Sequence, residues 1–169
     1  MTVTQDALSY KDNGVENMTY HPGCSIFDID GTLADIEHRR HFVRSKPKNW
    51  MAFRRGMAND LPCHDIIWLL KTMKAAGCAI LIASGRGEED RVVTETWLRD
   101  VAGVGDLYER LYMRPEGDYR SDDIVKGEIL DQMLVDGFLP TIAVDDRQSV
   151  TDMWRARGLR CLQCAPGDF

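Results

Sequence analysis

Apolar runs alternate with amphipathic stretches along most of the chain. Five runs are apolar at nearly every position, and each predicts a buried strand: 24–30, 78–84, 111–113, 139–146 and 159–164. Four stretches between or after them have apolar residues at helical spacing and end at glycine: 64–76, 88–102, 121–136 and 150–157. Strands that are apolar on both faces, alternating with helices, are typical of a parallel sheet covered on both sides. The pattern therefore predicts an α/β fold with a central parallel sheet.

Residues 1–22 are polar and show no periodicity, so they are expected to form an N-terminal tail. The remaining residues, 23–169, have the length of one domain. A segment at about 36–60 lies between the first strand and the 64–76 helix and is expected to be a small insertion. The chain is thus predicted to be a single domain with one inserted element.

The polar residues of most interest follow three of the predicted strands. Such sheets bind ligands beyond the carboxyl ends of their strands. The residues there are Asp28 and Asp30, Ser84 and Arg86, and Asp145 and Asp146. Two carboxylates so close together repel unless a cation offsets them, and oxygen ligands suit Mg²⁺. One acidic pair alone could equally be solvated acids at a helix start, but two pairs ending two buried strands favour a metal site.

Four motifs in this order resemble those of the haloacid dehalogenase (HAD) superfamily of phosphatases. They are FDIDGTL at 27–33, LIASGR at 81–86, Lys126 within SDDIVKGEIL, and AVDDR at 143–147. The resemblance implies a HAD-like Rossmannoid three-layer sandwich, with about five parallel strands and a small helical cap at about 36–60. A solvated lysine and a serine that merely caps a turn are the ordinary interpretations of Lys126 and Ser84, but their place in the motif order favours a catalytic role.

The resemblance also implies a role for each matched residue. Asp28 would attack phosphorus and form an aspartyl-phosphate, and Asp30 would protonate the leaving group and then activate water. Ser84 would bind a phosphoryl oxygen, and Lys126 would offset the negative charge. Thr32 and Gly85, inside the matched motifs, are expected beside the substrate. The implied Mg²⁺ ligands are Asp28, Asp30 through its backbone carbonyl, Asp145 and Asp146.

The inserted segment is strongly basic. Residues 38–55 contain seven of the chain's 21 Lys and Arg residues and no acid, although the net charge of the chain is −6. Phe42, Trp50 and Phe53 are interleaved with these charges. Positive charge with aromatic faces is typical of surfaces that bind nucleic acid. The alternative is that the aromatic residues pack inside the cap and the charges are solvated.

A closer resemblance is to the 3′-phosphatase domain of phage polynucleotide kinases. The matching stretches include 82–86, 93–104, 113–130 and 143–159, and the C-terminal Gly-Asp-Phe. This resemblance implies contacts from Arg39, Arg86 and Arg114 to the scissile phosphate or the strand, with Asp122 orienting an arginine. It implies DNA or RNA 3′ ends as substrates, with 2′,3′-cyclic phosphates as a further expectation, and a homo-oligomer as one assembly. The sequence does not rank DNA against RNA.

The chain departs from those kinases in having no G-x-x-x-x-G-K-[ST] motif, so no kinase activity is expected. It has no apolar run near ~18 residues and no secretory signal, which favours a cytoplasmic protein, and the resemblance suggests a phage gene. Five cysteines form no framework, and Cys161 and Cys164 are expected to be packed thiols rather than a zinc or redox pair.

Two other functions remain open from the sequence. A small-molecule phosphatase such as a nucleotidase would share the motifs, but it would not need the basic insertion. A binding module that has lost turnover would share the fold, although a degenerate site usually loses at least one of its catalytic residues. Sensitivity to salt separates the first alternative from a polynucleotide enzyme, because polynucleotide binding weakens steeply as salt rises.

Overall fold

The computed structural model describes residues 21–44 and 46–167. Its centre is a sheet of five strands in the order β5-β4-β1-β6-β7, in which every neighbouring pair is parallel. The strands are β1 (His21–Phe27), β4 (Ala79–Gly87), β5 (Arg110–Arg114), β6 (Phe138–Arg147) and β7 (Arg160–Gly167). The strand β1 is therefore central, and the chain leaves it into the cap.

Each strand of the sheet sends alternate side chains to opposite faces, as the pleat requires. Phe27 and Ile82 belong to one buried apolar cluster, and their neighbours Ile26 and Leu81 belong to the other. This two-sided burial is the reason that the strands are apolar at nearly every position.

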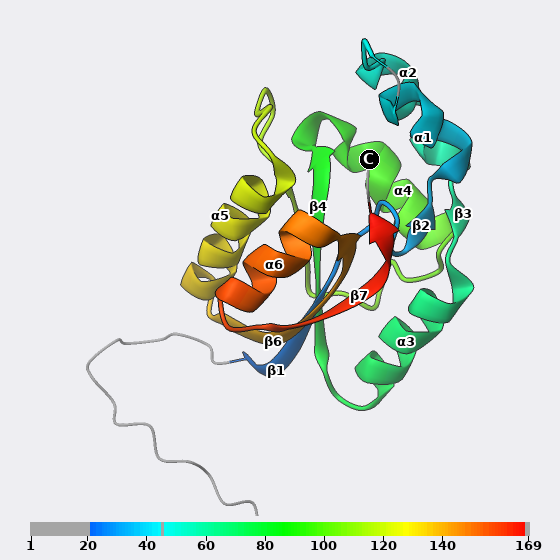
Figure 1. Ribbon diagram of the computed structural model, residues 1–169. Coiled ribbons are helices and arrows are strands. Elements are labelled where there is room, and N and C mark those ends of the chain that lie inside the picture. Colours follow the sequence, from blue (N-terminus) through cyan, green and yellow to red (C-terminus); the bar gives the residue numbers. More distant parts are fainter. Residues whose placement is uncertain (1–20, 45, 168–169) are drawn as a thin grey trace, which may run out of the picture.

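Helices cover both faces of the sheet (Figure 1). The helices α3 (His64–Ala75) and α4 (Arg91–Asp100) contribute Leu70 and Trp97 to the first cluster. The helices α5 (Asp122–Val135) and α6 (Gln148–Ala156) contribute Ile129 and Trp154 to the second cluster. The protein is thus a three-layer α/β sandwich, in agreement with the predicted fold class.

A cap lies between β1 and α3 in the sequence, beyond the carboxyl ends of the strands (Figure 1). Its helices are α1 (Glu37–Arg44) and α2 (Trp50–Arg55), followed by the 3-10 turn η1 (Met57–Asn59). Two short antiparallel strands, β2 (Ala34–Asp35) and β3 (Leu61–Pro62), join the cap to the core.

Differences from the sequence-based boundaries are local. Residues 21 and 22 lie in β1 rather than in the predicted tail, and the rest of that tail lies outside the described residues. The 3-10 turn η2 (Glu88–Asp90) precedes α4, so the α-helix begins three residues later than predicted. In the part of the chain that the structure describes, no helix is both long enough and apolar enough to cross a bilayer.

Candidate active site

Three buried carboxylates meet where the two central strands end. Asp28 directly follows β1, and Asp145 and Asp146 lie near the end of the neighbouring strand β6. Each offers one carboxylate oxygen, and these atoms lie within 4.8 Å of one another. The pairing of β1 with β6, continued by the Asp28 amide donating to the Val144 carbonyl (3.0 Å), brings these acids together.

Lys126 of α5 provides the cation that holds two of these acids. Its Nζ donates to Asp28 Oδ1 (2.6 Å) and to Asp145 Oδ2 (2.7 Å), and its side chain is fully enclosed. Burial alone would lower the pKa of Lys126, but Asp145 and Asp28 outweigh it and raise the pKa above its ordinary value. Lys126 is therefore a permanent positive charge beside Asp28.

One lysine does not balance three carboxylates. Burial, opposed by Lys126 and reinforced by the two neighbouring acids, raises the pKa of Asp28 well above its usual value. Burial and Asp145 raise the pKa of Asp146 to about 6. Asp146 Oδ2 is enclosed and has no hydrogen-bond partner among the described residues. An unpartnered carboxylate oxygen in an all-oxygen cluster is the chemistry that a hard divalent cation fits.

The turn after Asp28 leaves room for Asp146. Gly31 has a φ of +91°, and a Cβ at this position would lie 2.2 Å from Asp146 Oδ2. Only glycine meets both conditions, so the Asp-Gly step of the first motif follows from the geometry of the turn.

Asp30 faces away from this cluster and binds two arginines. Its Oδ1 accepts from Arg39 Nη2 (2.8 Å) and from Arg86 Nε (2.9 Å) and Nη2 (2.5 Å). Burial would raise the pKa of Asp30, but Arg86 and Arg39 outweigh it and lower the pKa below its usual value. The repulsion between Asp28 and Asp30 expected from the sequence is therefore relieved by separate cations.

Asp60, which belongs to no motif in the sequence, binds the same two arginines as Asp30 does. It accepts from Arg39 Nε and Nη2 (2.6 Å each) and from Arg86 Nη2 (2.8 Å), and it is 2% exposed. Its backbone carbonyl accepts from the Trp97 indole (2.8 Å). Asp60 follows the end of the acid-free basic run, and its role depends on how the cap folds back, so no spacing signal identified it.

Arg39 lies behind Asp30 rather than at a substrate surface. It is 1% exposed, and its guanidinium lies 4.1 Å from the centre of the Phe53 ring. This position does not match the direct contact to phosphate or strand predicted for Arg39. Arg86, by contrast, lines the cavity described below.

Ser84, Gly85 and Thr32 differ in their access to the site. Ser84 is fully buried, and its Oγ accepts from the Arg86 amide (3.2 Å), so in this structure it also supports the irregular last part of β4. Gly85 lines the cavity, and a Cβ there would lie 2.9 Å from an Asp122 oxygen. Thr32 is fully buried against Cys164 (Oγ1 to Sγ 3.6 Å), away from the cavity.

Asp122 at the start of α5 pairs with two arginines, and its predicted role as an orienter of an arginine stays a prediction. It binds Arg114 Nη2 and, at 2.6 Å, Arg147 Nη1. Arg114 also donates to the Gly85 carbonyl (2.9 Å). Arg147 belongs to the fourth motif, but no sequence pattern predicts its ion pair, because its partner Asp122 lies 25 residues away in the chain.

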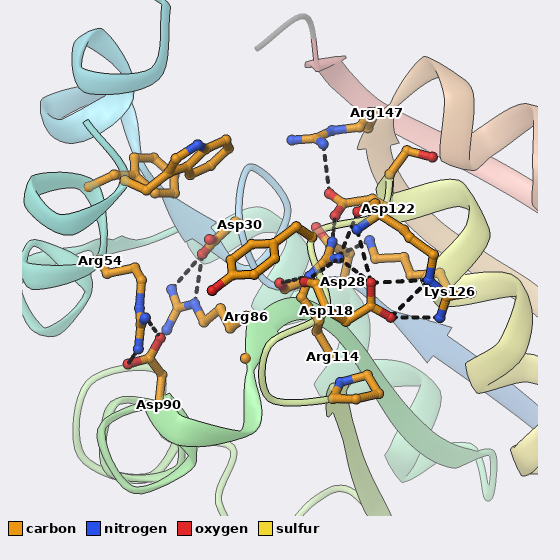
Figure 2. Close-up of a pocket in the computed structure, with 18 of the residues that line it drawn as sticks. Asp28, Asp30, Arg54, Arg86, Asp90, Arg114, Asp118, Asp122, Lys126 and Arg147 are labelled. Carbon is orange, nitrogen blue, oxygen red and sulfur yellow. Dashed lines mark hydrogen bonds and ion pairs between the residues drawn. The ribbon is translucent and has the colours of Figure 1, made fainter. Parts of the chain in front are cut away.

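These groups surround a cavity of about 430 Å³ at the carboxyl end of the sheet (Figure 2). Asp28 and Lys126 lie on one side of it, with Arg114, Asp118 and Asp122 beside them, and Arg54 and Asp90 lie on the opposite side (Figure 2). The cavity therefore opens between the core, the cap helix α2 and the loop between β5 and α5.

Much of the positive charge of the cap is already paired with acids. Arg39 binds Asp60 and Asp30, Arg40 and Arg44 lie near Glu37, and Arg54 binds Asp90 in a two-pronged contact (2.7 Å each). Of the basic run, Lys48 and Arg54 line the cavity. The basic run is therefore largely a set of ion pairs, and its contribution to an anionic ligand is concentrated at few residues.

A comparison with known families gives a match along nearly the whole domain. The family described as the polynucleotide kinase PNKP phosphatase domain, of the HAD type, matches residues 22–169. The chain belongs to this family. The four motifs that carry the resemblance in the sequence are the ones that the fold gathers around Asp28.

Solved structures agree with this assignment. The phosphatase domain is similar to a chain of the Pnkp1/Rnl/Hen1 RNA repair complex, with 32% identity and a TM-score of 0.73 over 98% of this chain and 48% of that one. A second structure of a Pnkp1/Rnl/Hen1 complex gives 31% identity and a TM-score of 0.71 over 99% and 53%. The chain thus spans about half the length of these relatives.

A more distant likeness supports the fold alone. The class C acid phosphatase from Bacillus anthracis, solved with tungstate bound, has 16% identity and a TM-score of 0.62 over 89% of this chain and 69% of that one.

Proposed function

We propose that this domain is a Mg²⁺-dependent phosphatase that removes 3′-phosphate from polynucleotide ends through an aspartyl-phosphate on Asp28. The observation that carries the proposal is the Asp28 carboxylate, held by Lys126 at 2.6 Å beside a cavity of about 430 Å³ that Arg86 also lines. The membership of the chain in the PNKP phosphatase family supports the polynucleotide substrate. So does its likeness to a chain from a complex described as an RNA repair complex.

The first half of the reaction joins Asp28 to phosphorus. An Asp28 carboxylate oxygen attacks the phosphorus in line, the bond between phosphorus and the 3′ oxygen breaks, and that oxygen takes a proton from Asp30. In the second half a water attacks the phosphorus and gives its proton to Asp30. The bond between phosphorus and Asp28 breaks, which releases inorganic phosphate and restores both carboxyl groups. Lys126 offsets the charge on Asp28 throughout.

Asp30 must gain a proton to act as the acid, and its arginine partners keep it ionised in the structure. An incoming phosphate attracts Arg86, which lines the cavity, and so weakens the hold of Arg86 on Asp30. Loss of that partner raises the pKa of Asp30. Substrate binding thereby prepares the acid that the first step needs.

Asp28, Asp145, Asp146 and the Asp30 carbonyl would hold the Mg²⁺. Their fit rests on the three clustered carboxylate oxygens and on the unpartnered Oδ2 of Asp146. When bound, the cation would neutralise the charge that builds up on the transferring phosphoryl group.

The proposal is tested with two matched oligonucleotides, one carrying a 3′-phosphate and the other a 5′-phosphate, each with Mg²⁺ or EDTA. Phosphate release is expected from the 3′ end only, and only with Mg²⁺. Asp28→Asn is expected to abolish release, whereas Asp106→Asn, an exposed acid outside the cavity, is expected to leave it unchanged.

Two results would contradict the proposal. Turnover of mononucleotides or a generic aryl phosphate, without release from either oligonucleotide, would keep the phosphatase chemistry but assign the protein to small-molecule substrates. Full activity of Asp28→Asn would remove Asp28 as the nucleophile.

A further inference from the structure

Two large aromatic side chains are exposed on the walls of the cavity that contains Asp28. Trp50 begins the cap helix α2 and is 54% exposed, and Tyr119 lies in the loop between β5 and α5 and is 96% exposed. Both line this cavity. An exposed aromatic ring does not gain the free energy that its burial would give. Two such rings in the cavity that contains Asp28 therefore indicate a surface that a ligand covers.

The Trp50 ring packs against a second aromatic ring of the cap. It lies edge-on to Phe53, with the ring centres 6.0 Å apart, and Phe53 is itself buried under the guanidinium of Arg39. Lys48 Nζ lies 5.1 Å from the centre of the Trp50 ring. The cap therefore presents an aromatic surface that is connected through Phe53 and Arg39 to Asp30, with the Lys48 ammonium over one face of the Trp50 ring.

Tyr119 is presented by a loop whose neighbouring residues are fixed. Arg114 Nη1 donates to the carbonyls of Asp118 (3.2 Å) and Arg120 (2.7 Å), the residues on either side of Tyr119. Arg120 is held in turn by the Asp118 and Glu128 carboxylates. The backbone of Tyr119 is therefore anchored while its ring stays in solvent, which reduces the entropy lost when a flat ligand binds.

The two walls face the same space. Figure 2 shows Arg54 of the cap and Asp118 of the loop on opposite sides of the cavity. Trp50 belongs to the same helix as Arg54, and Tyr119 directly follows Asp118 in the loop, and both aromatic residues line this cavity. The two rings are therefore carried by different walls of one cavity.

We propose that Trp50 and Tyr119 form a stacking site for the base of the 3′-terminal nucleotide, with Lys48 contacting the adjoining backbone phosphate. The proposal rests on the polynucleotide 3′-phosphatase function and specifies how that site distinguishes a nucleic-acid end from a simple phosphate ester. Stacking on an aromatic face accepts every base, which suits an enzyme acting on ends of any sequence. Lys48 supplies the charge complementarity that the paired arginines of the cap do not.

The test compares Trp50→Ala, Tyr119→Ala and, as a control, Trp68→Ala, an exposed tryptophan on α3 outside the cavity. On a 3′-phosphorylated oligonucleotide, KM is expected to rise about tenfold for each cavity variant, in line with the loss of one base stack, with kcat largely kept. Trp50→Phe is expected to recover most of the affinity. With acetyl phosphate, which has no ring to stack, all variants are expected to match the wild type.

A second substrate tests the base directly. Removal of the base from the terminal nucleotide of the oligonucleotide is expected to raise the wild-type KM by about the same factor. Removal of the base is expected not to raise the KM of Trp50→Ala any further, because the base and the Trp50 ring contact each other and that contact is already lost in the variant.

The outcomes separate this inference from the function on which it rests. If the wild type releases phosphate from acetyl phosphate but from no 3′-phosphorylated oligonucleotide, the proposed function fails and this inference with it. If the wild type acts on the oligonucleotide and Trp50→Ala and Tyr119→Ala behave as Trp68→Ala does, the stacking site alone is wrong. A full penalty from base removal in Trp50→Ala would likewise overturn it.

Discussion

At the scale of single residues, Asp60 links the cap, through Arg39 and Arg86, to Asp30, the proposed acid-base group. It binds both arginines that contact Asp30, and its partners His38, Arg39 and Arg86 lie 22, 21 and 26 residues away in the sequence. Arg39 and Arg86 each contact two carboxylates, so the position of Asp30 depends on a buried network of four charged groups. Asp60 is 2% exposed and is not among the residues that line the cavity, so we expect it to position Asp30 rather than to contact a substrate.

Replacement of Asp60 by asparagine tests this role. The substitution leaves two buried guanidinium groups short of one negative charge, and loss of one partner from a buried pair typically costs about 3–5 kcal/mol of stability. We expect the denaturant midpoint to fall accordingly and phosphatase activity to be lost with it. Asp131→Asn, which removes the exposed partner of Arg157, is the control and should change the midpoint little. An unchanged midpoint for Asp60→Asn would contradict the network.

At the scale of elements, the cap is fastened to the core by a clasp at the cavity. Arg54 of α2 binds Asp90 through two nitrogens and Glu89 at 3.0 Å, and both acids belong to η2, just after β4. The side chain of Arg54 is 44% exposed, so the clasp is screened by solvent. We therefore expect these ion pairs to affect the width of the cavity more than they affect the free energy of unfolding.

Arg54→Ala is accordingly expected to lower the free energy of unfolding by less than about 1 kcal/mol. The KM for the oligonucleotide should rise severalfold, because the wall that carries Trp50 is no longer tied to η2. Arg99→Ala removes an arginine that is paired with its neighbour Asp100 and serves as the control. Equal kinetics for the two variants would show that the clasp does not shape the cavity.

Elements also show what could be predicted from the sequence. The five strands and four core helices were predictable because strands that are buried on both faces of a sheet have continuous apolar runs. The acids at the ends of β1 and β6 lie close together, as expected. The β2–β3 pair was not predicted, since two residues carry no periodicity. The basic run suggested an open positive surface, whereas its partners Asp60, Asp90 and Glu89 come from outside that run.

At the scale of the whole molecule, the carboxylate cluster makes stability depend on pH. The pKa of Asp146 is raised to about 6, so the unfolded chain loses this proton at lower pH than the folded one. The folded state then binds more protons, and stability falls as pH rises from about 4 to about 6 and stays lower above that range. Asp146 alone accounts for up to about 3 kcal/mol of this loss, and the raised pKa of Asp28 acts in the same direction.

Mg²⁺ should reverse this loss. A bound cation favours the ionised carboxylates, so the increase in Tm on adding Mg²⁺ is expected to be larger at pH 8 than at pH 5. Thermal unfolding at the two pH values, with Mg²⁺ or EDTA, measures it without any substrate. Asp146→Asn should reduce both the pH dependence and the effect of Mg²⁺, with the contribution of Asp28 remaining. Equal Tm values with Mg²⁺ and with EDTA at pH 8 would argue against a metal site in this cluster.

The short β2–β3 ladder has a consequence for how such domains can diversify. It pairs Ala34 with Pro62 and Asp35 with Leu61, so the cap leaves and re-enters the core at neighbouring points. A foreign segment whose ends meet at the same spacing could be spliced in there without disturbing the sheet. Such a graft would still have to bring its own equivalents of Arg39 and Asp60, because Asp60 binds Arg39 and Arg39 binds Asp30, the proposed acid-base group. Exchange of the cap is thus topologically simple but chemically constrained.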